Sequence, residues 1–108
     1  MKKKYIIKST REFASIINKR QIVGSKYFAI YLEASQEDGS RYGISVPKKL
    51  GNAVLRNKKK RQLKNILIKD QNNFEIQKDC IIIVKKASLN LSFEELEKEL
   101  NRLLNKIK

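Results

Sequence analysis

The sequence predicts a single α+β domain in which helices cover a β-sheet. Residues 27–34 and 41–46 alternate apolar side chains with others at the period of a β-strand. Residues 80–84 are continuously apolar, which is typical of a central strand buried on both faces. Three further segments place apolar residues at helical spacing after a helix-capping residue. The length of 108 residues suits one compact domain, and 41% hydrophobic residues are enough for one core.

The first helix is expected at about residues 10–20. Ser9 and Glu12 have the spacing of a capping box, in which Ser9 is the N-cap and the Glu12 side chain reaches back to it. Phe13, Ile16 and Ile17 then follow at helical spacing. These three residues are therefore expected to form the apolar face of the helix.

Two strands follow, and each has two unequal faces. The faces of the strand at 27–34 carry Phe28, Ile30 and Leu32 on one side and Tyr27, Ala29 and Tyr31 on the other. Asp38-Gly39 lies between the two strands and is a strong hairpin signal. In the second strand Gly43 and Ser45 leave a shallow face, opposite the face of Tyr42, Ile44 and Val46.

The next helix is expected at about residues 53–69, with Asn52 as its N-cap. Its apolar stripe consists of Leu55, Leu63, Ile66 and Leu67. The residues opposite this stripe are Lys60, Arg61 and Lys64, with Lys58 and Lys69 on one flank. Arg56 and Lys59 fall on the apolar side, but in the first turns, where a helix often projects past its core.

A buried strand within residues 79–86 and a last helix complete the domain. Ser92 and Glu95 have the spacing of a second capping box. The apolar face of the last helix consists of Phe93, Leu96, Leu100, Leu103, Leu104 and Ile107. The expected order is one helix, two or three strands, a helix, a strand and a helix.

The formal charge of +14 predicts a polyanionic partner, because so basic a surface would otherwise repel itself. Residues 1–69 carry 18 Lys or Arg and 4 acidic residues, whereas residues 70–108 carry 7 of each. Residues 41–69 hold 10 basic residues and no acidic one. The whole charge excess therefore lies in the first two thirds of the chain and is densest around the second helix.

The basic helix is the strongest functional candidate. Residues 56–61 read RNKKKR, with Lys64 one turn on, and like charges at such spacing destabilise a helix by roughly 0.2–0.5 kcal/mol per pair. A solvated face in a lysine-rich protein would explain the charge, but such a face normally includes Glu. Nucleic-acid binding is therefore favoured, and the guanidinium groups of Arg56 and Arg61 suit bidentate contacts with phosphates or bases.

Aromatic residues form a second candidate site. Phe13, Tyr27 and Tyr31 are placed to line the space between the first helix and one sheet face, where bases of single-stranded RNA could stack. Ordinary core packing is the alternative, and it is favoured for Phe13 taken alone. Tyrosine hydroxyls need a partner or water, which favours an accessible face for Tyr27 and Tyr31.

Residues for catalysis by the protein itself are missing from the sequence pattern. There is no His, and Cys80 is the one cysteine, inside an apolar strand. The last helix carries the carboxylates Glu94, Glu95, Glu97 and Glu99, whose spacing suits solubility and the helix dipole. No apolar run approaches membrane-spanning length and no signal segment follows the basic start, so a cytoplasmic protein is expected.

Residues 42–61, YGISVPKKLGNAVLRNKKKR, resemble the signature of the bacterial ribonuclease P protein subunit. In that family a strand ending in Ser-X-Lys-Lys-hydrophobic-Gly-Asn-Ala-Val leads into an Arg-Asn-Arg-X-Lys-Arg helix. The matching positions are Lys48, Lys49, Arg56, Asn57, Lys60 and Arg61. Lys58 and Lys64 stand where the family has arginine, so they keep the charge but lose the guanidinium fork.

The resemblance covers essentially the whole domain and implies an α-β-β-β-α-β-α two-layer sandwich similar to ribosomal protein S5 domain 2. It also implies a left-handed β-α-β crossover around the basic helix, against the general right-handed rule. Phe13 and Tyr31 match aromatic residues of the family's cleft, and Ile17 stands where relatives often have a second Phe.

The function implied is that of a subunit of ribonuclease P, which removes the 5′ leader of precursor tRNA. The RNA subunit would carry out the hydrolysis with Mg²⁺, and no cofactor is expected on the protein, a monomer within the ribonucleoprotein. Residues implied at the catalytic RNA are Lys48, Lys49, Arg56, Asn57, Lys58, Lys60, Arg61 and Lys64. Residues implied at the leader, in a cleft, are Phe13, Ile17, Tyr27 and Tyr31.

Two other hypotheses remain open at this point. One is a ribosomal or nucleoid binding protein with no part in an enzyme, and the other is a basic domain with an unknown partner. No Gly-X-X-Gly loop marks a KH domain, and no aromatic-rich motif marks an RNA-recognition domain.

Overall fold

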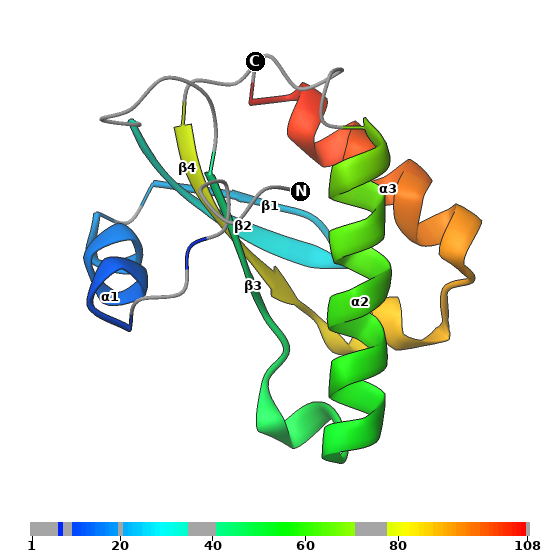
Figure 1. Cartoon of the computed structure of the whole chain (residues 1–108). Helices are drawn as coiled ribbons and strands as arrows, with labels where there is room; N and C mark the ends of the chain where they lie inside the picture. The colour runs from blue at the N-terminus through cyan, green and yellow to red at the C-terminus, as the bar shows by residue number, and fades with distance from the viewer. Residues whose placement is uncertain (1–6, 8–9, 20, 35–40, 71–77, 108) are drawn as a thin grey trace.

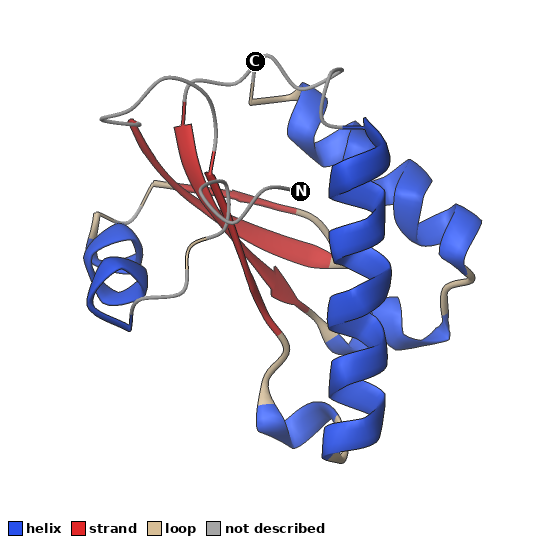
Figure 2. Ribbon diagram, in the orientation of Figure 1, coloured by secondary structure: helices blue, strands red, loops and turns tan. Residues whose placement is uncertain are grey.

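The computed structural model describes residues 7, 10–19, 21–34, 41–70 and 78–107. Its α-helices and strands follow one another along the chain in the expected order (Figures 1 and 2). They are α1 (Thr10–Asn18), β1 (Ile22–Gly24), β2 (Phe28–Ala34), β3 (Arg41–Ser45), η2 (Lys48–Leu50), α2 (Ala53–Asp70), β4 (Lys78–Val84), η4 (Lys86–Asn90) and α3 (Phe93–Asn105). The two short 3₁₀ helices, η2 and η4, were not anticipated from the sequence.

Strand β4 lies inside the sheet, as its continuous apolar run predicts. The strand order is β1-β2-β4-β3. β2 runs antiparallel to β1 and to β4, whereas β3 runs parallel to β4. Cys80 faces Leu32 of β2 on one side and Tyr42 of β3 on the other, so β4 is hydrogen-bonded along both edges.

The prediction that β2 and β3 pair as a hairpin is wrong. Both strands exist, but β4 lies between them and pairs with each. The Asp38-Gly39 sequence that indicated the hairpin lies outside the described residues. A turn sequence predicts only that the chain reverses direction locally. It cannot predict that β4, which comes later in the chain, lies between the two strands.

Helices cover both faces of the sheet, so the expected two-layer description is incomplete. In Figure 1, α2 and α3 lie on one side of the sheet and α1 lies on the other. The main core is formed with α2 and α3, and the sheet residues that contribute to it include Phe28, Ile30 and Leu32. A smaller cluster forms under α1 around Ile16 and Ile81. The likeness to ribosomal protein S5 and the hand of the β3-α2-β4 crossover stay predictions.

Capping residues fix where two helices begin. The backbone N–H of Leu55 donates to Asn52 Oδ1 at 2.9 Å, which confirms Asn52 as the cap of α2. At α3, the N–H of Glu95 donates to Ser92 Oγ and the N–H of Ser92 donates back to Glu95 Oε1. The hydrogen bond from the Ser92 backbone lowers the pKa of Glu95. The capping box predicted at Ser9 lies outside the described residues.

Within residues 7, 10–19, 21–34, 41–70 and 78–107, no helix combines the length and the apolar character needed to cross a membrane.

Candidate RNA-binding surfaces

Helix α2 presents a cationic face to solvent. Leu63, Ile66 and Leu67 are 0–1% exposed, which confirms the predicted apolar stripe and anchors the helix on the main core. The side chains exposed on this helix include Asn57, Lys58, Lys60, Arg61 and Lys64. Five of the eight residues predicted to contact a catalytic RNA therefore lie on one accessible helix, which we call the α2 surface.

Lys48 and Lys49 extend the α2 surface at its beginning. Both are exposed and lie on η2, directly before α2 in the chain. A Cβ atom at Gly51 would lie only 2.5 Å from Leu55 Cδ2, so this segment packs closely against the first turn of α2. The Gly51-Asn52 pair thus holds the two lysines close to the start of the basic helix.

Arg56 differs from the other predicted RNA-binding residues. It is half-buried rather than fully outside the core, and its Nε atom is buried without a hydrogen-bond partner among the described residues. A buried donor without a partner is costly, because it has lost its contact with water. Its contact with RNA stays a prediction, and a change at this position would perturb packing as well as charge.

Lys59 is buried, although it was expected in a part of α2 that projects past the core. Only 5% of the residue is exposed, and its Nζ donates to the Leu91 carbonyl at 3.5 Å. The chain between η4 and α3 covers this turn of the helix. Burial lowers the pKa of Lys59, and the positive charge of neighbouring Lys58 lowers it further.

The second face of the sheet, under α1, brings together three of the four residues predicted for a cleft. Phe13, Ile17 and Tyr31 are half-buried and pack around a buried cluster of Ile7, Ile16 and Ile81. Phe13 and Ile17 come from α1, and Tyr31 comes from β2. Sequence alternation predicted that Tyr31 lies on the face opposite Phe28, Ile30 and Leu32, and this is confirmed.

Tyr27 does not join that cluster, so its predicted place beside Tyr31 is wrong. It packs against the main core on the other face of the sheet. Ser25 Oγ accepts hydrogen bonds from the backbone N–H groups of Tyr27 and Phe28, at 3.2 and 3.3 Å. Tyr27 therefore lies in the turn before β2, where the alternation of strand side chains does not yet apply.

The strand register arranges the side chains under α1 into three rows across the sheet. Partners in the register point to the same face, so each row crosses β2, β4 and β3. The rows are Glu33–Asp79–Arg41, Tyr31–Ile81–Gly43 and Ala29–Ile83–Ser45. The first row is charged, the second contains the aromatic ring, and the third has small residues on both sides of Ile83. We call this the α1 face.

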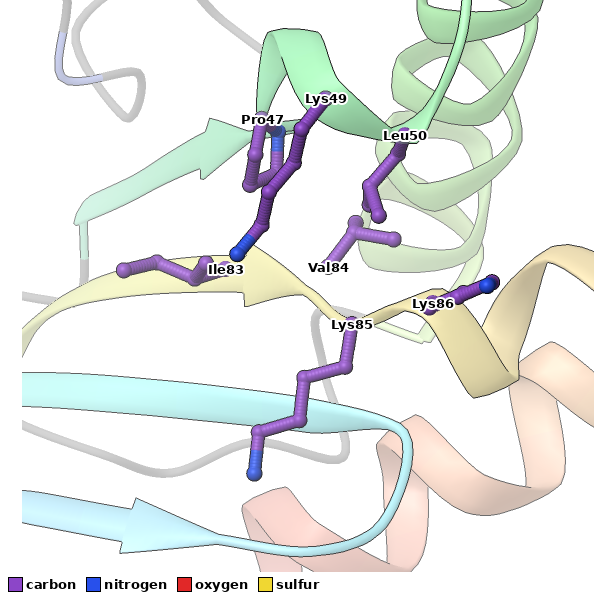
Figure 3. Close-up of a pocket in the computed structure, with 7 residues that line it drawn as sticks. All are labelled: Pro47, Lys49, Leu50, Ile83, Val84, Lys85 and Lys86. Atoms are coloured by element: carbon purple, nitrogen blue, oxygen red, sulfur yellow. The ribbon is translucent and has the colours of Figure 1, made fainter.

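A partly open pocket of about 510 Å³ lies at the end of the α1 face beyond the third row. Its lining consists of Pro47, Lys49, Leu50, Ile83, Val84, Lys85 and Lys86. Figure 3 shows Lys49 reaching from η2 toward Ile83, while Lys85 and Lys86 leave the end of β4 in different directions. Lys85 Nζ donates to the Ser25 carbonyl at 2.8 Å, so its charge lies toward the turn before β2.

Lys85 and Lys86 were missed as candidate site residues. The available signal is that each of two strands is followed by a lysine pair, Lys48-Lys49 after β3 and Lys85-Lys86 after β4. Parallel neighbouring strands end at the same edge of a sheet, so the two lysine pairs lie close together there. Using that signal requires knowing that β3 and β4 are parallel neighbours.

Catalytic groups are sparse in the described part of the chain. There, no three His, Cys, Asp or Glu residues gather where they could hold a metal ion. Cys80 is fully buried, and burial raises the pKa of its thiol to about 12. A thiol held protonated in a central strand behaves as a small core residue, in agreement with the sequence interpretation.

The burial of Cys80 leads to an expected outcome in chemical labelling. At pH 8, iodoacetamide is expected to alkylate the native protein at least about 10³-fold more slowly than the guanidinium-unfolded protein, because the thiolate population is that much smaller. Mass spectrometry over time measures the difference. Equal rates in the two states would show that the thiol is accessible.

Comparison with known proteins identifies the family of the chain. The family model Ribonuclease P matches residues 1–108. The ribonuclease P protein component of Mycoplasma mycoides subsp. mycoides SC is 44% identical over 109 residues, which covers 100% of both chains. The RNase P protein of Staphylococcus aureus is similar in structure, with a TM-score of 0.86, 34% identity and coverage of 96% of this chain and 95% of that chain.

A second solved structure describes an S. aureus RNase P protein mutant with defective mRNA degradation activity. It is similar with a TM-score of 0.88 and 35% identity, and it covers 96% of this chain and 88% of that one. The sequence signature and the mixed α+β fold both agree with these matches. The chain belongs to the ribonuclease P protein family.

Proposed function

We propose that this chain is the protein subunit of ribonuclease P, which assists the endonucleolytic removal of the 5′ leader from precursor tRNA. It binds the catalytic RNA through one surface and the leader through another. The observation that carries the proposal is that α2 and α1 cover opposite faces of the sheet, so that the exposed cations of α2 lie apart from the aromatic residues under α1. Two separate RNA-binding surfaces are what a protein that bridges an RNA enzyme and its substrate needs.

The α2 surface is assigned to the catalytic RNA. Its exposed lysines and Arg61 have no acidic residue beside them along α2 before Asp70. Cations in such an arrangement neutralise phosphates and release counterions, which supplies affinity without base specificity. A folded RNA of defined shape is the partner that suits a rigid helix anchored by its opposite side on a core.

The α1 face is assigned to the leader. The ring of Tyr31, with Phe13 beside it, offers a stacking surface, and the row Ala29–Ile83–Ser45 continues as a shallow floor. The pocket lined by Lys85 and Lys86 follows, and Lys49 lies on the border between this pocket and the α2 surface. An aromatic site, a shallow floor and a cationic end are the parts that bind an extended single strand, with bases on the rings and phosphates at the lysines.

The hydrolysis itself is assigned to the RNA subunit acting with Mg²⁺, and the protein is proposed to need no cofactor of its own. What supports this division of labour is the family membership. The monomeric state of the protein and its cytoplasmic location stay predictions.

Addition of the protein to the catalytic RNA at low Mg²⁺ is the test. Cleavage of precursor tRNA at the mature 5′ end is expected to rise with the protein present, and the protein alone is expected to cleave nothing. A ribosomal or nucleoid binding protein would give no such rise. Failure to stimulate, with the protein folded and bound to the RNA, would reject the proposal.

The substrates incubated with the protein alone should include an mRNA, because a mutant of the S. aureus relative is described as defective in mRNA degradation activity. We expect no cleavage here, because the sequence has no His and its one cysteine is buried in a central strand. Cleavage that persists through purification and disappears in a point variant would show activity in the protein alone.

A further inference from the structure

Gly43 of β3 lies directly against the tip of the Phe13 ring. A Cβ atom added at Gly43 would lie 2.6 Å from Phe13 Cζ, 2.9 Å from Cε2 and 3.3 Å from Cε1. Favourable contact between carbon atoms is at about 3.5–4.0 Å, so two of these distances are strongly repulsive. The ring therefore occupies the space that a side chain at position 43 would need.

The backbone of α1 is held in place beside this contact. Arg41 lies two residues before Gly43 on the same face of β3, and its Nη1 is 2.8 Å from Glu12 Oε2. Arg41 also donates to both carboxylate oxygens of buried Asp79, from Nε at 3.1 Å and from Nη2 at 2.7 Å. The bidentate pair with Asp79 fixes the Arg41 guanidinium on the sheet, and the single ion pair with Glu12, the residue before Phe13, connects it to α1.

A side chain at position 43 would consequently displace the ring rather than the helix. The atoms in conflict are the far end of the Phe13 side chain, which can rotate, and none of them is backbone. The ring would leave its seat on β3 and change its position relative to Tyr31, which lies in the same register row as Gly43 through Ile81.

We propose that Gly43 is a positioning residue for the α1 face. Because Gly43 has no side chain, the Phe13 ring can pack directly on β3. This packing fixes the position of the ring on which a leader base stacks. The inference rests on the proposed leader-binding function. It adds that β3 governs leader affinity without itself providing a stacking group.

The test uses three variants in the reconstituted holoenzyme: Gly43→Ala, Phe13→Leu and the double variant. Gly43→Ala is expected to weaken precursor tRNA binding by at least about 5-fold, the low end for loss of one stacked base, and to leave mature tRNA binding unchanged. Leucine lacks Cζ and both Cε atoms, so Gly43→Ala should cost nothing further in the Phe13→Leu background.

Gly24→Ala is the matched control. Gly24 also lies in a strand of this sheet, but a Cβ atom there would meet only the Phe28 carbonyl oxygen, at 3.9 Å. This variant is expected to bind both RNAs as the unaltered protein does. Thermal unfolding followed by circular dichroism monitors the fold of every variant.

The outcomes separate this inference from the function on which it rests. Weaker precursor binding by Phe13→Leu together with normal binding by Gly43→Ala would overturn the role of Gly43 and keep the leader-binding function. If Phe13→Leu leaves precursor tRNA binding unchanged, leader binding at this position is overturned. If Gly43→Ala folds poorly, the double variant is the decisive test. A loss of precursor tRNA affinity greater than that of Phe13→Leu alone would contradict the proposed contact between Gly43 and the Phe13 ring.

Discussion

Replacing Tyr31 with alanine is expected to weaken the binding of precursor tRNA to the holoenzyme by about 5- to 150-fold, as for the loss of one stacked base. The lower part of this range is favoured. Tyr31 is only half-buried under α1, and its neighbour Ile17 provides no second ring. The measurement is equilibrium binding of precursor tRNA and mature tRNA to holoenzyme reconstituted with each variant.

Mature tRNA is the internal control for Tyr31→Ala, because it lacks the leader and should bind almost unchanged. Tyr27→Ala is the matched variant, because Tyr27 packs against the main core on the other side of the sheet. It is expected to lower the melting temperature without altering the ratio of the two affinities. Equal losses for both RNAs with Tyr31→Ala, in a folded protein, would show that this face does not hold the leader.

Removing the charges of Lys60, Arg61 and Lys64 together should weaken binding to the catalytic RNA on the order of 10²- to 10³-fold at 0.1 M salt. Each lost phosphate contact reduces the slope of log affinity against log salt by about 0.9, so the slope should fall by roughly 3. All three side chains are exposed, and the fold is expected to survive. Arg56 is left unchanged because its side chain is half-buried, so a substitution there would alter packing as well as charge.

The matched control for this triple variant removes three exposed cations from the other end of the chain, at Lys98, Arg102 and Lys106. The change in net charge is identical, so a general loss of attraction would affect both variants equally. The α2 variant alone is expected to lose affinity steeply. Similar salt slopes for the two variants would mean that the catalytic RNA is attracted by net charge and not by the α2 surface.

Local patterns predicted the helices and strands well. The caps at Asn52 and Ser92, the apolar stripe of α2 and the burial of the strand at 80–84 are all found in the structure. Each of these depends on residues within a few positions of one another, where hydrogen-bond geometry and side-chain periodicity act directly. The grouping of Phe13 and Tyr31 under α1 was proposed from the residues, whereas Ile17 was added by the family resemblance.

The errors arise where distant parts of the chain meet. Lys59 was expected at an exposed end of α2, and only the path of the chain through Leu91 shows that this turn is covered. The lysine pair at 85–86 becomes part of a pocket only because β4 is parallel to β3. Tyr27 is an error of another kind, since the strand begins one residue later than its alternation suggested.

The central place of β4 has a consequence for the order in which the protein can assemble. Among the described residues, β3 is joined to the rest of the sheet only through β4, which ends at Val84. The first 69 residues carry the whole net charge of +14, and the last 39 carry none. A nascent chain that has completed the basic helix therefore still lacks the strand that unites its sheet and the helix α3 that completes its main core.

Such non-local pairing is slow, because the entropy of closing a long loop is lost before the contacts form. During that interval the cationic segment is self-repelling and unpacked, and any RNA that neutralises it lowers the repulsion that opposes compaction. Synthesis from the N-terminus thus exposes the RNA-binding half first, and closure of the domain waits for the neutral C-terminal third.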